Sequence, residues 1–322
     1  MKSKGQSTKI NELIIRNTIC SKGKKIPHGS NSDVYEYRSR NGLKYAVKFL
    51  KDEYKSKDNP RFIRFINEIR FLIENKDIDG IVPIVDCKYS IDDNVNKKTE
   101  IWYAMPFCEN FNYNGNINKI IKDFIDLANT LKILHGNKKY HRDIKPENLL
   151  YYNDRLCLTD FGLLFDDNNT NNRITREGER IGPYKILPPE LLSSNINMEI
   201  EYSKSDIYLL AKTLWIAITK NDDGFLGEYN RHVNQIYLDR EKYGVYTFEP
   251  LHLLMEGSTK YYFGDRITID EFISYLEIQE SIINNMASKD ISNKYKYEED
   301  IKYLKANNNE ELRQYTDIKA YR

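Results

Sequence analysis

Residues 141–150 read HRDIKPENLL, a stretch in which charged and amide side chains stand close together and then give way to leucines. A solvated loop carries such charges by chance, but it does not require Asp143, Lys145 and Asn148 at fixed offsets. The pattern therefore indicates a loop with a chemical task beside an apolar strand, and the remainder of the chain decides which task.

A second polar group follows a few residues later. Residues 155–164 read RLCLTDFGLL, an apolar strand that ends in DFG at positions 160–162. Asp143, Asn148 and Asp160 then lie on neighbouring loops. Carboxylate and amide oxygens of this kind suit Mg2+, which proteins commonly share with the phosphates of a nucleotide. The acid that the metal does not need is left to act as a base.

HRDIKPENLL, DFG and PPE (residues 188–190), in this order and spacing, resemble the catalytic core of the eukaryotic-type (Hanks-type) serine/threonine protein kinases. Each piece alone has an ordinary structural explanation, but the decapeptide is specific and the pieces occur together. The resemblance implies an α+β, bilobal protein-kinase-like fold that uses ATP and Mg2+ to phosphorylate a protein substrate, with autophosphorylation.

The resemblance also implies a role for each motif residue. Asp143 would orient the substrate hydroxyl and accept its proton, and Lys145 would neutralise charge on the transferred phosphoryl group. Asn148 and Asp160 would hold Mg2+.

Upstream residues match the nucleotide-binding part of the same family. Lys48, in YAVK, would grip the α- and β-phosphates, and Glu68 on the next helix would be its ion-pair partner. Further positions would surround the adenine: Gly29 in the phosphate-covering loop, Val34, Ala46 and Leu150 around the base, Met105 as gatekeeper, and the hinge Pro106, Phe107 and Cys108.

Downstream residues match structural and regulatory positions. Asp206 resembles the acid that braces the catalytic loop, and Arg266 resembles the partner of Glu190. Arg142 would pair with a phosphorylated residue between DFG and PPE, for which Thr175 is the best candidate and Thr170 a second one. A phosphate there would add about two negative charges and order the segment.

Two motifs depart from the family pattern. In the phosphate-covering loop only Gly29 remains, because Pro27 and Ser32 stand at the other glycine positions. Pro183 replaces the threonine that usually follows the glycine at position 182, which affects how a peptide would be placed. The sequence of this segment, from EGERIGP to PPE, resembles that of compact bacterial members of the family.

Periodicity predicts a small β-rich first lobe and a helical second lobe. Alternation around Asn41 and Gly42 predicts a hairpin, and apolar spacing with a start at Asn59 and Pro60 predicts a helix. The remaining expectations are strands within residues 80–90 and 100–107, a helix over 117–136 and helices from Met198 onward. The expected domain order begins with an arm over 1–19 that contains at most a short helix. A kinase domain follows over 20–285, with lobes 20–106 and 107–285, and a polar helical extension covers 286–322.

Composition narrows the class of protein. The 322 residues carry 49 basic and 48 acidic side chains, so no overall field favours nucleic acid or an anionic membrane. The four cysteines are widely spaced, which argues against a disulfide framework or a zinc site. With no signal peptide and no apolar run long enough to span a bilayer, we expect a cytoplasmic protein. The sequence leaves the oligomeric state open.

Two other functions compete with the protein kinase. A small-molecule phosphotransferase of the antibiotic or choline kinase type shares the aspartate and asparagine chemistry, but the intact segment from Asp160 to Glu190 argues against it. A pseudokinase that only binds partners fits the reduced glycine loop, but it does not need Lys48, Glu68 and Asp143 together.

Overall fold

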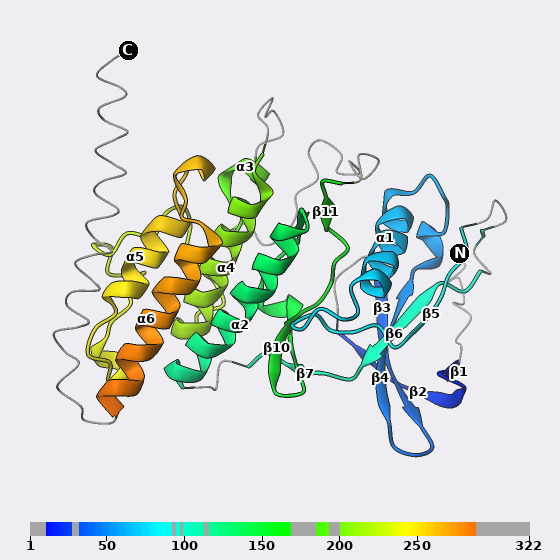
Figure 1. Cartoon of the computed structure of the whole chain (residues 1–322). Helices are drawn as coiled ribbons and strands as arrows, with labels where there is room; N and C mark the ends of the chain where they lie inside the picture. Colours follow the sequence, from blue (N-terminus) through cyan, green and yellow to red (C-terminus); the bar gives the residue numbers. More distant parts are fainter. Residues whose placement is uncertain are drawn as a thin grey trace, which may run out of the picture. The chain divides into compact units, whose positions relative to one another are not determined.

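The computed structural model describes residues 11–27, 32–91, 95–96, 99–112, 116–168, 185–192 and 200–287, without the side chains of 285–287. The chain divides into two compact units, residues 1–111 with 133–179 and residues 112–132 with 180–322. The described part of the first unit is rich in strands and that of the second in helices (Figure 1). The predicted α+β class is confirmed, and the predicted lobe boundary after residue 106 stays a prediction.

The first unit is built on a six-stranded antiparallel sheet with the order β1-β2-β3-β4-β6-β5. Its strands are β1 (Glu12–Ile15), β2 (Thr18–Ile26), β3 (Ser32–Ser39), β4 (Lys44–Leu50), β5 (Asp86–Lys88) and β6 (Trp102–Pro106). β3 and β4 form the predicted hairpin, in register from Ser32 opposite Leu50 to Arg38 opposite Lys44. Gly42 in its turn has φ 87°, a left-handed conformation that favours glycine.

The two faces of this sheet differ in character. Residues directly opposite one another in antiparallel strands point to the same side, so alternate positions separate the faces. One face packs a hydrophobic cluster of Leu13, Ile15, Cys20, Tyr37, Tyr45, Val47, Trp102 and Ala104. The other face carries Val34, Ala46, Lys48, Tyr103 and Met105. Four residues that the sequence analysis assigned to nucleotide binding, Val34, Ala46, Lys48 and Met105, thus lie on the same face of the sheet as Tyr103.

The predicted N-terminal arm is wrong for residues 12–19, which belong to the sheet. β1 pairs with β2 through a two-residue turn in which Arg16 and Asn17 have φ of 46° and 60°. Ile15 is fully buried in the hydrophobic cluster, and the backbone N–H of Arg16 donates to Asp86 at 2.8 Å. The strand is only four residues long and its turn lacks glycine, so its pattern is weak without its packing partners.

Helix α1 (Pro60–Glu74) begins where the sequence predicted. The side chain of Asn59 accepts a hydrogen bond from the backbone N–H of Arg61 at 2.9 Å, and Pro60 occupies the first turn, where its missing N–H costs nothing. Figure 1 shows the helix beside the sheet. Its buried residues are Phe62, Phe65, Ile66, Glu68, Ile69, Phe71 and Leu72, so one carboxylate is buried with the apolar face.

Short strands frame the loops of the first unit. β7 (Glu109–Asn110), β9 (Leu149–Tyr152) and β10 (Arg155–Leu158) form one sheet, and β8 (Lys139–Tyr140) pairs with β11 (Phe165–Asp166). The strand expected before DFG is therefore confirmed. The strand expected within residues 80–90 is shorter than predicted: apart from β5, only Ile81 pairs, through a single bridge to Leu158. Pro83 interrupts the segment because it has no N–H to donate.

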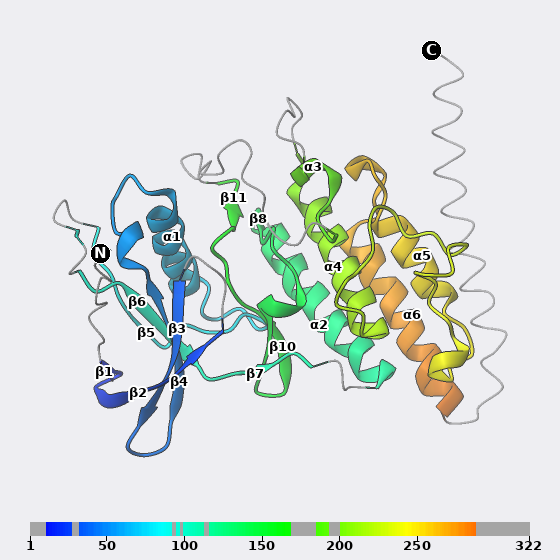
Figure 2. The same cartoon turned by 180° about the vertical axis from the view of Figure 1, so that it is seen from behind.

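Helices dominate the second unit, where α5 packs against both α4 and α6 (Figure 2). Their bounds are α4 (Tyr202–Thr219), α5 (Glu249–Ser258) and α6 (Ile269–Ala287), with a short α3 (Pro189–Leu192) before them. The predicted helix α2 (Ile117–Gly136) passes from this unit into the first. No helix in the described ranges is long and apolar enough to cross a bilayer.

Residues 220–248 differ from the helical pattern expected after Met198. They contain one short 3-10 helix and otherwise no helix or strand. Lys220, with φ 59°, ends α4, and Gly224, Gly227 and Gly244 also have positive φ, between 61° and 68°, a conformation that a regular right-handed helix does not contain.

Candidate active site

A buried ion pair joins the sheet to α1. Lys48 on β4 donates to both carboxylate oxygens of Glu68, at 2.9 and 3.0 Å. Lys48 is 4% exposed and Glu68 2%, so both charges have left water. A pair this deeply buried is sustained by its geometry, because either charge alone would be strongly destabilising. The structure thus forms the ion pair that the resemblance implied.

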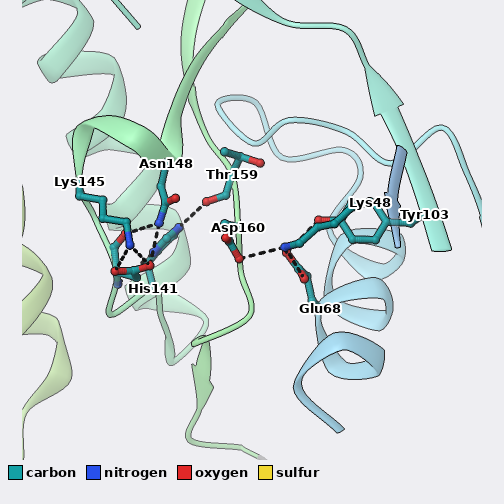
Figure 3. Close-up of polar contacts among 9 residues, drawn as sticks. Lys48, Glu68, Tyr103, His141, Lys145, Asn148, Thr159 and Asp160 are labelled. Atoms are coloured by element: carbon teal, nitrogen blue, oxygen red, sulfur yellow. Dashed lines mark hydrogen bonds and ion pairs between the residues drawn. The ribbon is translucent and has the colours of Figure 1, made fainter. Parts of the chain in front are cut away.

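Asp160 brings a second carboxylate to the same ammonium. Its Oδ1 accepts from Lys48 Nζ at 3.1 Å. Asp160 follows β10 in a left-handed conformation, with φ 60°, which is uncommon outside glycine and turns its side chain away from the strand direction. A Cβ at Gly162 would stand 3.3 Å from this oxygen, so glycine leaves room for the carboxylate. Figure 3 shows Lys48 between Glu68 and Asp160.

The charge balance of this network follows from burial and its two acids. Burial lowers the pKa of Lys48, but the carboxylates of Asp160 and Glu68 outweigh it and hold the pKa well above its usual value. Burial raises the pKa of Glu68, and the neighbouring Lys48 opposes that rise. Lys48 is therefore a fixed cation facing two acceptors, a suitable partner for phosphate oxygens.

The loop that carries Asp143, Lys145 and Asn148 is held by a buried histidine, His141, at its start. The backbone N–H of Asp143 donates to His141 Nδ1 at 3.3 Å, and Nε2 lies 3.2 Å from the carbonyl of Thr159. These partners assign the proton to Nε2, which donates to that carbonyl. The ring also contacts Phe161, with centroids 4.8 Å apart. Arg142, at φ 67°, is the second strained backbone position near the site.

Asp143 is fixed by two side chains of its own loop. Lys145 Nζ donates to its carboxylate oxygens at 2.9 and 2.7 Å, and Asn148 Nδ2 donates to Oδ2 and to the backbone carbonyl, both at 2.8 Å. Burial raises the pKa of Asp143, and the Lys145 ammonium opposes the shift. A raised pKa makes the carboxylate a better proton acceptor near neutral pH.

Asn148 and Asp160 fit the metal ligands that the resemblance implied. Asn148 commits its amide nitrogen to Asp143, so its carbonyl oxygen is the atom left for a cation. Asp160 supplies a carboxylate on the neighbouring loop (Figure 3). One amide oxygen and one carboxylate, with phosphates and water completing the shell, is a donor set that suits Mg2+.

The residues assigned to the adenine occupy compatible places. Ala46 stands opposite Met105 in register and shares the Lys48 face of the sheet with Val34. Leu150 lies on β9, and Cys108 follows β6 half-buried, its thiol donating to the carbonyl of residue 106 at 3.4 Å. Gly29 lies outside the described residues.

In the second unit, Glu190 and Arg266, to which the resemblance gave structural roles, form a buried ion pair. Arg266 donates to both carboxylate oxygens of Glu190, at 2.6 and 2.8 Å, and the pair is almost completely buried. Asp206 is fully buried in α4. In the first unit Arg142 is 5% exposed, with its guanidinium 5.9 Å from the ring of Phe165. Thr175 lies outside the described residues.

Sequence reasoning missed one polar member of the site. Tyr103 on β6 donates its hydroxyl to Glu68 Oε1 at 2.9 Å. The alternation of residues 100–107 predicts that Tyr103 and Met105 share a face, but nothing in that pattern shows which polar group the hydroxyl meets. The sequence offered one clue, which is that Tyr103 stands two residues before Met105, the expected gatekeeper.

Comparison with known proteins agrees with the resemblance to protein kinases. The model of the family described as "Protein kinase domain" matches residues 20–261. A membrane-associated tyrosine- and threonine-specific cdc2-inhibitory kinase, wee-1.3 of Caenorhabditis elegans, is 37% identical over 100 residues, 31% of this chain and 14% of that protein. A putative serine/threonine-protein kinase of Acanthamoeba polyphaga mimivirus is 35% identical over 101 residues, 31% of this chain and 35% of the relative.

A bacterial relative matches a similar share of the chain. Serine/threonine-protein kinase PknH of Mycobacterium bovis is 35% identical over 94 residues, 29% of this chain and 15% of that protein. The chain thus matches between 14% and 35% of the length of these three relatives.

Proposed function

Because this chain belongs to the protein kinase family, we propose that it is a serine/threonine protein kinase that transfers the γ-phosphoryl group of ATP to a protein hydroxyl. One observation carries the proposal: the first unit holds Lys48 against Glu68 and Asp160 (Figure 3), and it holds Asp143 against Lys145 and Asn148. These are the cation, the metal ligands and the base that phosphoryl transfer requires.

Each side chain then has a defined task. Lys48, held by Glu68, binds phosphate oxygens of the nucleotide. Asn148 and Asp160 would hold Mg2+, which would neutralise charge on the phosphates. Asp143 orients the substrate hydroxyl and accepts its proton as the oxygen attacks the γ-phosphorus and the bond to the β-phosphate oxygen breaks. Lys145 stabilises the charge that develops on the transferred group.

The substrate class is supported by the catalytic loop and by the relatives. Lys145 stands two residues after Asp143, as in serine/threonine kinases, and relatives from a virus and from a bacterium are named serine/threonine-protein kinases. Autophosphorylation is part of the proposal. Val34, Ala46, Met105, Cys108 and Leu150 would receive the adenine, and Gly29 the phosphates.

All four cysteines are free, which supports a reducing compartment such as the cytoplasm.

A transfer assay with labelled ATP separates the three candidate functions. The acceptors are a generic protein, a panel of small alcohols and a panel of aminoglycosides, each tested with wild type, Lys48→Met and Asp160→Ala. Label on protein serine and threonine that disappears in both variants supports the proposal. Label on a small molecule identifies the small-molecule phosphotransferase, and nucleotide binding without any transfer identifies the pseudokinase.

A further inference from the structure

Tyr103 is placed to act on the phosphate-binding lysine through its carboxylate partner. It stands directly opposite Lys48 in the register of β4 and β6, and both side chains leave the same face of the sheet. Lys48 Nζ lies 5.6 Å from the centre of the tyrosine ring. The tyrosine is 1% exposed, so its hydroxyl has no access to bulk water and needs a partner inside the protein.

That partner is the carboxylate that orients the lysine. The hydroxyl donates to Glu68 Oε1 at 2.9 Å, the oxygen that also accepts from Lys48 at 2.9 Å. Glu68 Oε2 accepts from Lys48 as well, at 3.0 Å. The phenol therefore supplies the second donor to a buried anion, and hydrogen bonds to charged groups are stronger than neutral ones.

The same ring also contacts α1 one turn before Glu68. Phe65 precedes Glu68 by three residues and therefore lies on the same side of the helix. Its ring centroid is 5.6 Å from that of Tyr103. Tyr103 thus holds α1 at two points, by an apolar contact at Phe65 and by a hydrogen bond at Glu68.

We propose that Tyr103 is a positioning residue for phosphoryl transfer, which keeps Glu68 turned toward Lys48 so that the ammonium faces the nucleotide phosphates. The partner of its hydroxyl is Glu68, so the residue acts through Glu68. The proposal rests on the phosphate-binding role proposed for Lys48.

Removal of the hydroxyl leaves a buried carboxylate oxygen with one donor in place of two. A hydrogen bond to a charged group corresponds to roughly tenfold to a hundredfold in an equilibrium constant. Tyr103→Phe keeps the ring, its contact with Phe65 and its volume. We therefore expect a loss of about tenfold in kcat/KM for ATP, at the lower end of that range because Lys48 still holds Glu68.

Adenosine distinguishes a positioning role from a general defect of the sheet, because adenosine lacks the phosphates that Lys48 would bind. Tyr103→Phe should leave the Kd of adenosine within about twofold of wild type while kcat/KM for ATP falls. Tyr37→Phe is the matched control, since Tyr37 is fully buried in the same sheet but on the opposite face. It should change neither quantity.

A double-mutant cycle tests whether Tyr103 acts through Glu68. In a Glu68→Ala background, Tyr103→Phe should cause no further loss of kcat/KM, since the interaction partner is gone. An equal loss in both backgrounds, a parallel loss of adenosine binding, or wild-type kcat/KM in Tyr103→Phe each overturns the proposal. If Lys48→Met also retains wild-type kcat/KM, the proposed function of the lysine fails as well, so the two failures are distinguishable.

Discussion

Lys212, a buried lysine on α4, should make the folded state more stable as the pH rises. Its side chain is fully buried, and Nζ donates to the carbonyls of Phe225 at 2.8 Å and Gly227 at 2.6 Å. The ring of Phe225 lies 3.3 Å below the nitrogen. No carboxylate of the described residues contributes to its charge balance, and burial lowers the pKa of Lys212 to about 6.

The sign of the effect follows from proton binding. In the unfolded chain this lysine returns to a pKa of 10.5. Between pH 6 and 10.5 the unfolded chain therefore binds a proton that the folded chain does not, and the free energy of unfolding rises with pH. One proton gives at most about 1.4 kcal/mol per pH unit, or about 3 kcal/mol between pH 7 and 9.

The assay is urea unfolding of wild type and Lys212→Met at pH 7, 8 and 9 and constant ionic strength. Other titrating groups contribute to both proteins, so the difference between the two slopes isolates Lys212. We expect the wild-type free energy of unfolding to rise more steeply by up to about 1.4 kcal/mol per unit. Parallel slopes would refute the reasoning, because the two carbonyls and the aromatic ring would then keep the folded lysine protonated.

Three further outcomes test other parts of the molecule. Ile15→Ala on β1 should lower the free energy of unfolding by about 2–5 kcal/mol, whereas the 64% exposed neighbour Ile14→Ala should change it by no more than about 0.5 kcal/mol; similar losses would contradict the burial of β1. After incubation with Mg-ATP, mass spectrometry should find phosphate on Thr175, and Thr175→Ala should be less active; an unmodified threonine with full activity in the alanine variant would place regulation elsewhere. A chain that ends at Ala287 should still bind ATP, and loss of binding would show that the following segment belongs to the core.

Local patterns were sufficient where an element carries its own signal. The β3–β4 hairpin was predictable because Gly42 supplies a positive φ between two alternating runs, and α1 because Asn59 and Pro60 mark its start. The Lys48–Glu68 pair followed from the family resemblance. The structure adds that the pair is buried and that Lys48 also contacts Asp160.

Features that depend on distant packing were not predictable. β1 is stabilised because Ile15 is buried in the hydrophobic cluster on one face of the sheet. A strand of four residues has too short an alternating pattern to predict this burial from sequence. The hydroxyl of Tyr103 finds Glu68 only because β6 and α1 meet. Lys212 lies inside an apolar helical run, and no local pattern shows that the carbonyls of Phe225 and Gly227 accept hydrogen bonds from it.

The most direct test of the account is the rate of phosphoryl transfer by Asp143→Asn, measured with labelled ATP and a generic protein. Losing the base should reduce the rate by on the order of 10²-fold or more, while nucleotide affinity and the circular dichroism spectrum stay unchanged. Asp154→Asn is the matched control, because Asp154 lies exposed in the β9–β10 turn at φ 62°, a conformation that asparagine tolerates, and it should transfer at the wild-type rate. Wild-type transfer by folded Asp143→Asn would contradict the central claim that this carboxylate receives the substrate proton.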